Sequence, residues 1–351
     1  MYWVNGEVFE KVGMDVPPEI WDIQTFENIG KEFVKRANPA GERQMVYFAP
    51  DLNRFALARS MGVTTYNETL TDVNYDDPLF IAAYKLMYKW THEDHLFPTA
   101  AERESFSSAS GYGGVNMQLF NAGRFALLES GRYALIQLRE FNKTRREKGE
   151  PLLKLSVSRL PYEHFPVTQA STRCAGNYAG SPNKHLSKLF LAYLASEDYN
   201  MQIVSDADSL PPNPKYTTIR EFTHPADYPE EWGVHEPFAK TMLEIAIPSD
   251  HGPFIVPATV ESDRNQLLSV HLEQRATPEV ATADAVKEIR DEIARTLRED
   301  PKLVPLYEEA KATQKKIEEY RAQGKLVPLS WIKNPFYRKY YQFKGWAAVN
   351  E

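Results

Sequence analysis

Helical segments alternate with short apolar stretches along this chain, and this alternation most strongly limits the folds available to it. Residues 21–37 carry apolar side chains at helical spacing and end in lysine and arginine, which predicts a helix. Residues 123–131 form an apolar run between two glycines, which is typical of a buried strand. Further helices are expected over 52–61, 78–91, 115–121, 133–148, 184–205, 214–222, 236–246, 258–274 and 277–323, with a break near Pro301, and strands over 44–48 and 153–160. The pattern predicts an α/β fold.

Length and charge exclude several classes of protein. The 351 residues suffice for two domains or one large one. With 41 basic and 48 acidic residues the net charge is −7, which argues against a nucleic-acid partner. The single cysteine, Cys174, excludes an internal disulfide and a multi-cysteine zinc site. Aromatic residues make up 12% of the chain, and they suit either a well-filled core or the recognition of sugar rings.

Four short motifs follow one another along the chain. The first, residues 3–22, contains a Pro-Pro pair and ends in Trp-Asp. The second, residues 120–133, reads Phe-Asn-Ala-Gly-Arg-Phe-Ala-Leu-Leu-Glu-Ser-Gly-Arg-Tyr. The third, residues 180–212, opens with Gly-Ser-Pro-Asn-Lys and ends in Leu-Pro-Pro, and the fourth, residues 277–289, opens with Thr-Pro-Glu. Each motif alone is common, so their order carries the weight.

In this order the motifs resemble those of the extracellular solute-binding proteins, family 1, that serve sugar-type ABC importers. The resemblance implies a periplasmic-binding-protein type II-like α/β fold, with two lobes that close on a ligand. It also implies capture of a sugar or oligosaccharide between the lobes, and a membrane ABC permease as partner. A periplasmic or extracellular, membrane-associated location is expected, without catalysis, a cofactor or a metal.

The resemblance also implies how the chain is divided. The first motif corresponds to an interior segment of the family, so the first lobe is expected to be incomplete here. Residues 1–170 and 223–300 would form the second, C-terminal lobe, and residues 171–222 would be the remnant of the first. Residues 301–351 would form a helical tail rich in aromatic and basic residues. Two hypotheses remain for this tail: a belt at a membrane interface, or a segment that wraps the lobe with its rings buried.

The second motif supplies the main candidate for ligand binding. Gly131 permits a tight turn, after which Tyr133, in place of the family's tryptophan, would stack on a sugar ring. Arg132 could fork onto vicinal hydroxyls or onto a carboxylate, which leaves room for an acidic sugar. The alternative for Arg132 is a solvated charge.

Other candidate ligand-binding residues follow from their position in the family. Asp51, Asn53 and Arg54 lie in one loop and would contact sugar hydroxyls; the alternative is a helix N-cap with two solvated neighbours. The remaining candidates are Tyr112, Asn177, Tyr178, Glu261 and Arg264.

Two other classes of function remain open, and one apparent metal motif is discounted. An enzyme acting on carbohydrate would need an acid and a base across one cleft. A structural or adaptor protein would use the same lobe without a ligand. The run His92-Glu93-Asp94-His95 is one residue short of a His-Glu-x-x-His zinc motif, and it is more typical of a polar helix end.

Overall fold

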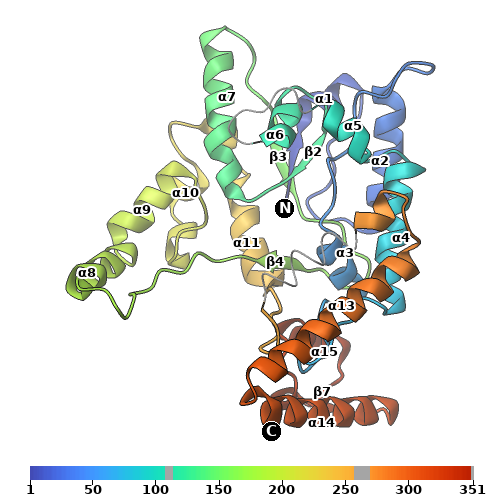
Figure 1. Cartoon of the computed structure of the whole chain (residues 1–351). Coiled ribbons are helices and arrows are strands. Elements are labelled where there is room, and N and C mark those ends of the chain that lie inside the picture. Colours follow the sequence, from blue (N-terminus) through green and yellow to red (C-terminus); the bar gives the residue numbers. More distant parts are fainter. Residues whose placement is uncertain (107–113, 257–268, 349–351) are drawn as a thin grey trace. The chain divides into compact units, whose positions relative to one another are not determined.

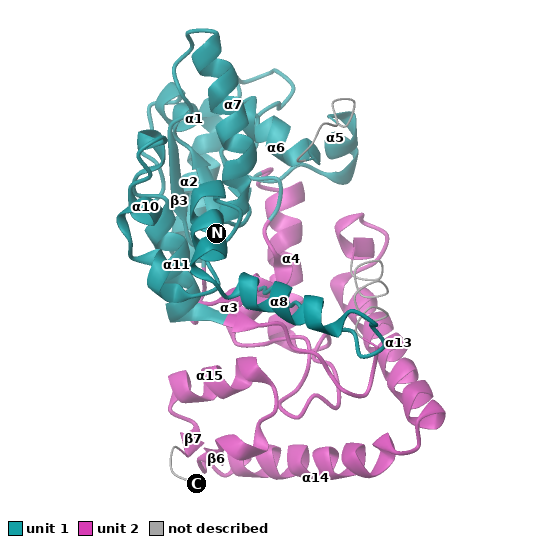
Figure 2. Cartoon of the chain, turned by 90° about the vertical axis from the view of Figure 1, so that its left-hand side faces the viewer, with its two compact units in different colours: residues 1–51, 96–161, 171–246 teal, residues 52–95, 162–170, 247–351 magenta. Residues whose placement is uncertain are grey.

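The computed structural model describes residues 1–106, 114–256 and 269–348. They form two compact units, which Figure 2 distinguishes by colour. Unit 1 comprises residues 1–51, 96–161 and 171–246, and unit 2 comprises residues 52–95, 162–170 and 247–351. Each unit is therefore assembled from segments that are far apart in the sequence.

A three-stranded sheet lies at the centre of unit 1. Its strands are β1 (Tyr2–Asn5), β2 (Leu127–Glu129) and β3 (Leu155–Ser158), in the order β2-β1-β3 and antiparallel throughout. Trp3 lies opposite Leu128 on one side and Val157 on the other. All four residues of β1 are buried. The first residues of the chain are thus the central strand of this sheet.

Helices surround this sheet in unit 1. Helices α7 (Leu135–Glu147), α6 (Gly114–Asn121) and α11 (His235–Ile245) contribute Leu135, Phe120 and Phe238 to the core around Trp3. The helical elements of the unit are α1 (Gly6–Lys11), α2 (Ile23–Ala37), α5 (Ala100–Ser105), α6 (Gly114–Asn121), η1 (Arg132–Ala134), α7 (Leu135–Glu147), α8 (Lys184–Leu194), α9 (Glu197–Asp206), η2 (Pro214–Thr217), α10 (Arg220–Thr223), η3 (Pro229–Glu231) and α11 (His235–Ile245).

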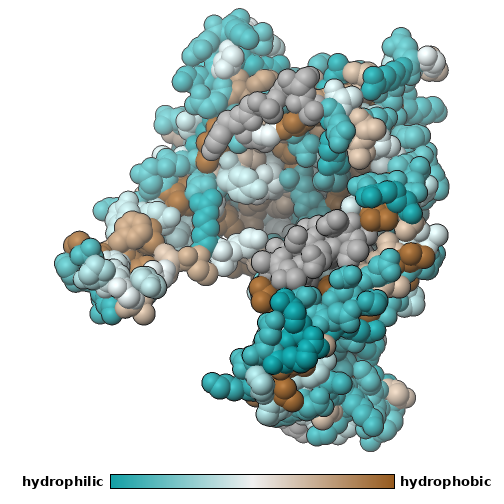
Figure 3. Space-filling view, in the orientation of Figure 1, coloured by the Kyte–Doolittle hydropathy of each residue, from teal (hydrophilic) through white to brown (hydrophobic). Residues whose placement is uncertain are grey.

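Helix α8 of unit 1 has no buried residue. Its apolar side chains recur at helical spacing, as in helices that bury one stripe against a core. Four of its large side chains are between 44% and 67% exposed: Leu186, Leu189, Phe190 and Tyr193. Figure 3 shows apolar surface over α8. We refer to these four residues as the α8 stripe.

Unit 2 is mostly helical. Its helices are α3 (Arg54–Met61), α4 (Pro78–His92), α13 (Pro278–Glu299), α14 (Leu303–Ala322) and α15 (Pro335–Lys344), with a 3-10 turn η4 (Leu329–Trp331) (Figure 1). Strands β4 (Thr168–Ala170) and β5 (Ala246–Pro248) pair, and β6 (Val327–Pro328) pairs in parallel with β7 (Ala347–Ala348). Helix α3 ends at Gly62, whose φ of 110° favours glycine, and a Cβ there would lie 2.3 Å from the Tyr340 hydroxyl.

The aromatic tail is buried within unit 2. Phe336, Tyr337, Tyr340 and Tyr341 of α15 pack with Phe165, Ile247 and Ile317 in one cluster. This burial supports the hypothesis of a tail that wraps the protein rather than a belt at a membrane. Among the residues that the structure describes, no helix is both long and apolar enough to cross a bilayer.

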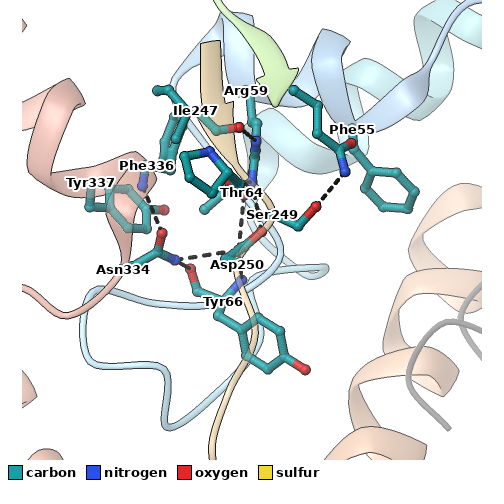
Figure 4. Close-up of polar contacts among 12 residues, drawn as sticks. Phe55, Arg59, Thr64, Tyr66, Ile247, Ser249, Asp250, Asn334, Phe336 and Tyr337 are labelled. Carbon is teal, nitrogen blue, oxygen red and sulfur yellow. Dashed lines mark hydrogen bonds and ion pairs between the residues drawn. The ribbon is translucent and has the colours of Figure 1, made fainter. Parts of the chain in front are cut away.

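A buried polar network joins three segments of unit 2 around Asp250 (Figure 4). Arg59 of α3 donates to Asp250 Oδ1 at 2.8 Å, and Thr64 Oγ1 and the Tyr66 amide each donate to Oδ2 at 3.0 Å. Asn334, the N-cap of α15, donates to the same oxygen at 3.3 Å. A charged pair in the interior needs such additional donors to offset its lost hydration. The network therefore fixes the tail against α3 and the loop after it.

Most of the expected helices are present, with boundaries shifted by a few residues. The helix expected over 277–323 is broken near Pro301 as predicted, into α13 and α14. The helix expected over 184–205 is instead two, because Ser196 caps a new helix by accepting a bond from the Tyr199 amide. The strand expected over 44–48 is wrong: Tyr47 forms only an isolated bridge with Phe125. Most of the segment 258–274 lies outside the described residues.

Candidate functional site

Tyr133 is displayed on the surface of unit 1 by the turn that follows β2. Its side chain is 51% exposed, and one edge of the ring lies against Gly131. A Cβ on Gly131 would lie 2.5 Å from Tyr133 Cε1, so only glycine permits this position. Trp3 of β1 donates from Nε1 to the Gly131 carbonyl at 3.0 Å and thereby anchors the turn. The ring is thus an exposed aromatic platform held by the central strand.

Arg132, the neighbour of this platform, points into the protein and is 3% exposed. Its Nη1 donates to the carbonyls of Ile203 (3.2 Å) and Ser209 (2.7 Å), and its Nη2 donates to Val204 at 3.0 Å. The carbonyls of Ile203 and Val204 belong to the final turn of α9, where no further N–H groups of the helix can bond them. The guanidinium therefore caps α9 and fixes the segment after it.

Three further groups support Arg132 from within unit 1. Its Nε donates to Nδ1 of buried His235 at 3.1 Å, and His235 Nε2 lies 3.3 Å from Glu231. Glu231 in turn binds Arg139 through two bonds of 2.7 and 2.8 Å. Burial lowers the pKa of Arg132 to about 10, so the side chain stays charged at neutral pH. Burial also lowers the pKa of His235, consistent with the neutral ring that an acceptor Nδ1 requires.

Unit 1 also contains an exposed ion pair between Arg173 and Asp208. Arg173 donates from Nη1 and Nη2 to the two oxygens of Asp208, at 2.7 and 3.1 Å. The hydrogen bond with Asp208 raises the pKa of Arg173, and the Tyr133 hydroxyl acts on it in the same direction. Asp208 follows Ala207, which is buried and adopts a left-handed backbone at φ 57°. Neither residue of the pair stood out in the sequence.

Asn177 and Tyr178 lie in the segment between β4 and α8. The Tyr178 ring is 77% exposed and lies against Gly180, where a Cβ would come within 2.8 Å of it. Buried Oδ1 of Asn177 has no hydrogen-bond partner among the described residues. Both side chains thus have unused binding capacity on unit 1, as a ligand contact requires.

The candidates from the loop before α3 fall in different units. Asp51 belongs to unit 1, where it accepts a hydrogen bond of 3.2 Å from Arg103. Asn53 and Arg54 belong to unit 2. Asn53 is the N-cap of α3, because its Oδ1 accepts from the amides of Phe55 (3.0 Å) and Ala56 (3.2 Å). The helix-cap alternative is therefore present, at Asn53. Arg54 lies over the Tyr84 ring at 5.9 Å.

Three of the predicted site residues lie outside the described residues: Tyr112, Glu261 and Arg264. Within the described part of the chain, no group of histidine, cysteine, aspartate and glutamate side chains could hold a metal ion. His92 instead contacts the carbonyl of Leu272 at 2.7 Å and packs on Tyr88.

Sequence reasoning missed the Arg173–Asp208 pair because its two residues lie 35 positions apart. Asp208 could have been noticed as the residue between the end of α9 and the Leu-Pro-Pro turn of the third motif. The burial of Arg132 had no sequence signal, because its partners lie 71 to 103 residues further along the chain.

Comparison with solved structures identifies the fold. The chain matches carbohydrate-binding proteins of ABC transporters, in each case over more than four-fifths of its own length. A substrate-binding protein from Listeria monocytogenes, in complex with cycloalternan, has a TM-score of 0.63 and 15% identity, over 83% of this chain and 68% of that one. Maltose-bound MalE3 of T. maritima has a TM-score of 0.58 and 17% identity, over 82% and 69%.

A third match is the maltose/maltodextrin-binding domain of Bdellovibrio bacteriovorus bound to maltotriose, with a TM-score of 0.60 and 14% identity, over 83% of this chain and 70% of that one. No family profile and no curated protein matches the chain in sequence. The protein therefore has a mixed α/β fold of the periplasmic-binding-protein type.

Proposed function

We propose that this protein is the substrate-binding component of a carbohydrate ABC importer. It would capture a sugar or oligosaccharide and deliver it to a membrane permease, in a periplasmic or extracellular location. The observation that carries this proposal is the Tyr133 platform, an exposed ring at the position where the resembling family has a sugar-stacking aromatic. The apolar face of a pyranose packs on such a ring.

Other groups of unit 1 support the same function. Asn177 and Tyr178 have unused hydrogen-bonding or stacking capacity, and Asp51 is exposed enough to meet a hydroxyl. The roles of Asn53 and Arg54 in ligand binding, and those of Tyr112, Glu261 and Arg264, stay predictions. Arg132 is proposed to position the platform instead of contacting the ligand, because its hydrogen bonds are directed into unit 1.

The α8 stripe bears on the expected division into lobes. A helix with an apolar stripe normally buries it, and exposed patches of this kind mark interaction surfaces. The stripe therefore supports the proposal that residues 171–222 belong to a first lobe which the described residues leave incomplete.

Isothermal titration with a panel of neutral saccharides, including maltose and maltotriose, tests the binding function. We expect at least one saccharide to bind with a dissociation constant in the micromolar range or below, and Tyr133→Ala to weaken it about tenfold or more. Phe343→Ala is the matched control, because Phe343 is an equally exposed ring in unit 2.

Equal binding by the wild type and the Tyr133→Ala variant would remove the platform from the site. Absence of binding to every saccharide would favour the structural or adaptor alternative. Release of product from a chromogenic glycoside, which we do not expect, would favour the carbohydrate-active enzyme.

A further inference from the structure

One buried side chain links the segment that carries Asp208 to the segment that carries the Tyr133 platform. Arg132 precedes Tyr133 in the chain, and its Nη1 donates to the carbonyl of Ser209, which follows Asp208. The 2.7 Å bond thus ties the backbone next to the platform to the backbone next to the carboxylate. Burial of Arg132 makes this tie rigid, since its other N–H groups are held by Ile203, Val204 and His235.

The backbone at Ala207 turns Asp208 away from the core. Ala207 ends α9 with φ 57° and ψ 21°, in the left-handed region that residues other than glycine rarely adopt. Such a conformation persists only where the surroundings enforce it, and here the Ala207 side chain is fully buried. Asp208 is the next residue, and about a quarter of its side chain is exposed.

Arg173 neutralises Asp208, and both side chains keep unused polar groups. The two side chains meet in a fork, with bonds of 2.7 and 3.1 Å to different carboxylate oxygens, and the Arg173 side chain is 76% exposed. Each carboxylate oxygen keeps a lone pair, and the guanidinium keeps N–H groups directed elsewhere. The pair offers acceptors and donors close together while carrying no net charge.

We propose that the Arg173–Asp208 pair determines the specificity of the Tyr133 site and selects neutral saccharides over acidic ones. This inference rests on the proposed function. Sugar hydroxyls can donate to Asp208 and accept from Arg173 while the fork stays intact. The carboxylate of an acidic sugar would be repelled by Asp208 and would have to displace it from Arg173, so it gains little from the arginine.

Two substitutions test this inference because they move the selectivity in opposite directions. Affinities for maltotriose and for trigalacturonate are measured with the wild type, with Asp208→Asn and with Arg173→Gln. Asp208→Asn frees the Arg173 fork and should raise the affinity for trigalacturonate relative to maltotriose about tenfold. Arg173→Gln leaves the Asp208 charge unpaired and should lower that relative affinity about tenfold. A purely structural role would weaken both ligands alike.

The matched control is Glu10→Gln, which removes the carboxylate of another exposed ion pair in unit 1, with Lys154. It should leave the selectivity unchanged, and thermal melting verifies that all variants are folded. If both pair variants keep the wild-type selectivity within twofold, or if the wild type prefers trigalacturonate, the inference is overturned while sugar binding stands. If no form binds any saccharide, the proposed function is overturned with it.

Discussion

Tyr341 donates a hydrogen bond of 2.6 Å to Glu68, which joins α15 to the loop after α3. Glu68 is 5% exposed and also accepts from Gln314 Nε2 at 2.8 Å and Arg321 Nη1 at 3.2 Å, both on α14. Its carbonyl accepts from the amides of Lys333 and Asn334. One buried glutamate thus binds the three segments that form the end of unit 2.

Removing the Tyr341 hydroxyl should destabilise the protein. Tyr341→Phe leaves a buried carboxylate short of one donor, and the loss of a hydrogen bond to a charged group costs about 2 kcal/mol of unfolding free energy. Urea denaturation measures this loss. Tyr340→Phe is the matched control from the same helix, because the Tyr340 hydroxyl has no hydrogen-bond partner among the described residues, and it should cost less than about 0.5 kcal/mol. Equal losses for the two variants would contradict the role of Glu68.

The stability of the protein should depend on pH through His235. The folded state holds this histidine neutral, because burial lowers its pKa, whereas the unfolded chain takes up a proton below about pH 6.5. The unfolded state then binds more protons, so the unfolding free energy falls as the pH is lowered from 7 to 5. One such group contributes at most about 1.4 kcal/mol per pH unit.

His235→Asn separates this contribution from the others. Asparagine can still accept from Arg132 but does not titrate, so the variant should show a shallower fall in stability between pH 7 and 5, measured by urea denaturation at each pH. His164→Asn, which removes an exposed histidine, should keep the wild-type slope. His271, whose pKa burial also lowers, adds to the slope of all three proteins alike. An unchanged slope in the His235 variant would show that this ring is not held neutral.

The α8 stripe should bind a hydrophobic dye. We expect the double variant Leu189→Gln/Phe190→Gln to lower the fluorescence of the dye ANS at least twofold, because the stripe is a contiguous apolar surface. Its unfolding free energy should change by less than about 1 kcal/mol, since both side chains are mostly exposed. Leu243→Gln, at an equally exposed leucine on α11, is the control for a single apolar side chain. Undiminished dye binding would show that the stripe is covered in solution.

Local sequence signals predicted much of the secondary structure. Asp77 before Pro78 marked the start of α4, and Gly62 marked the end of α3, because caps and left-handed ends depend on residues adjacent in the chain. The strand expected over 44–48 failed for the opposite reason. An apolar run becomes a strand only if a partner lies alongside it, and Tyr47 has a single bridge.

In the candidate site, too, local features could be predicted and contacts with distant residues could not. The motif ending in Gly131 and Tyr133 indicated the platform, because the glycine and the ring that lies on it are two residues apart. The same motif suggested Arg132 as a ligand contact. The direction of its guanidinium depends on the carbonyls that accept its hydrogen bonds, and these belong to α9 and Ser209.

The sequence by itself determined the α/β class, the helix ends at Asp77 and Gly62, and the glycine-supported aromatic platform. All of these depend on residues within a few positions of one another. Only the tertiary structure decided that β1 is the central strand, that the aromatic tail is buried, and that Asp208 meets Arg173. Those outcomes depend on pairings across 35 residues for Arg173 with Asp208 and across 273 for Glu68 with Tyr341. Burial and hydrogen bonding between distant segments select such pairings, and the local order of side chains does not encode them.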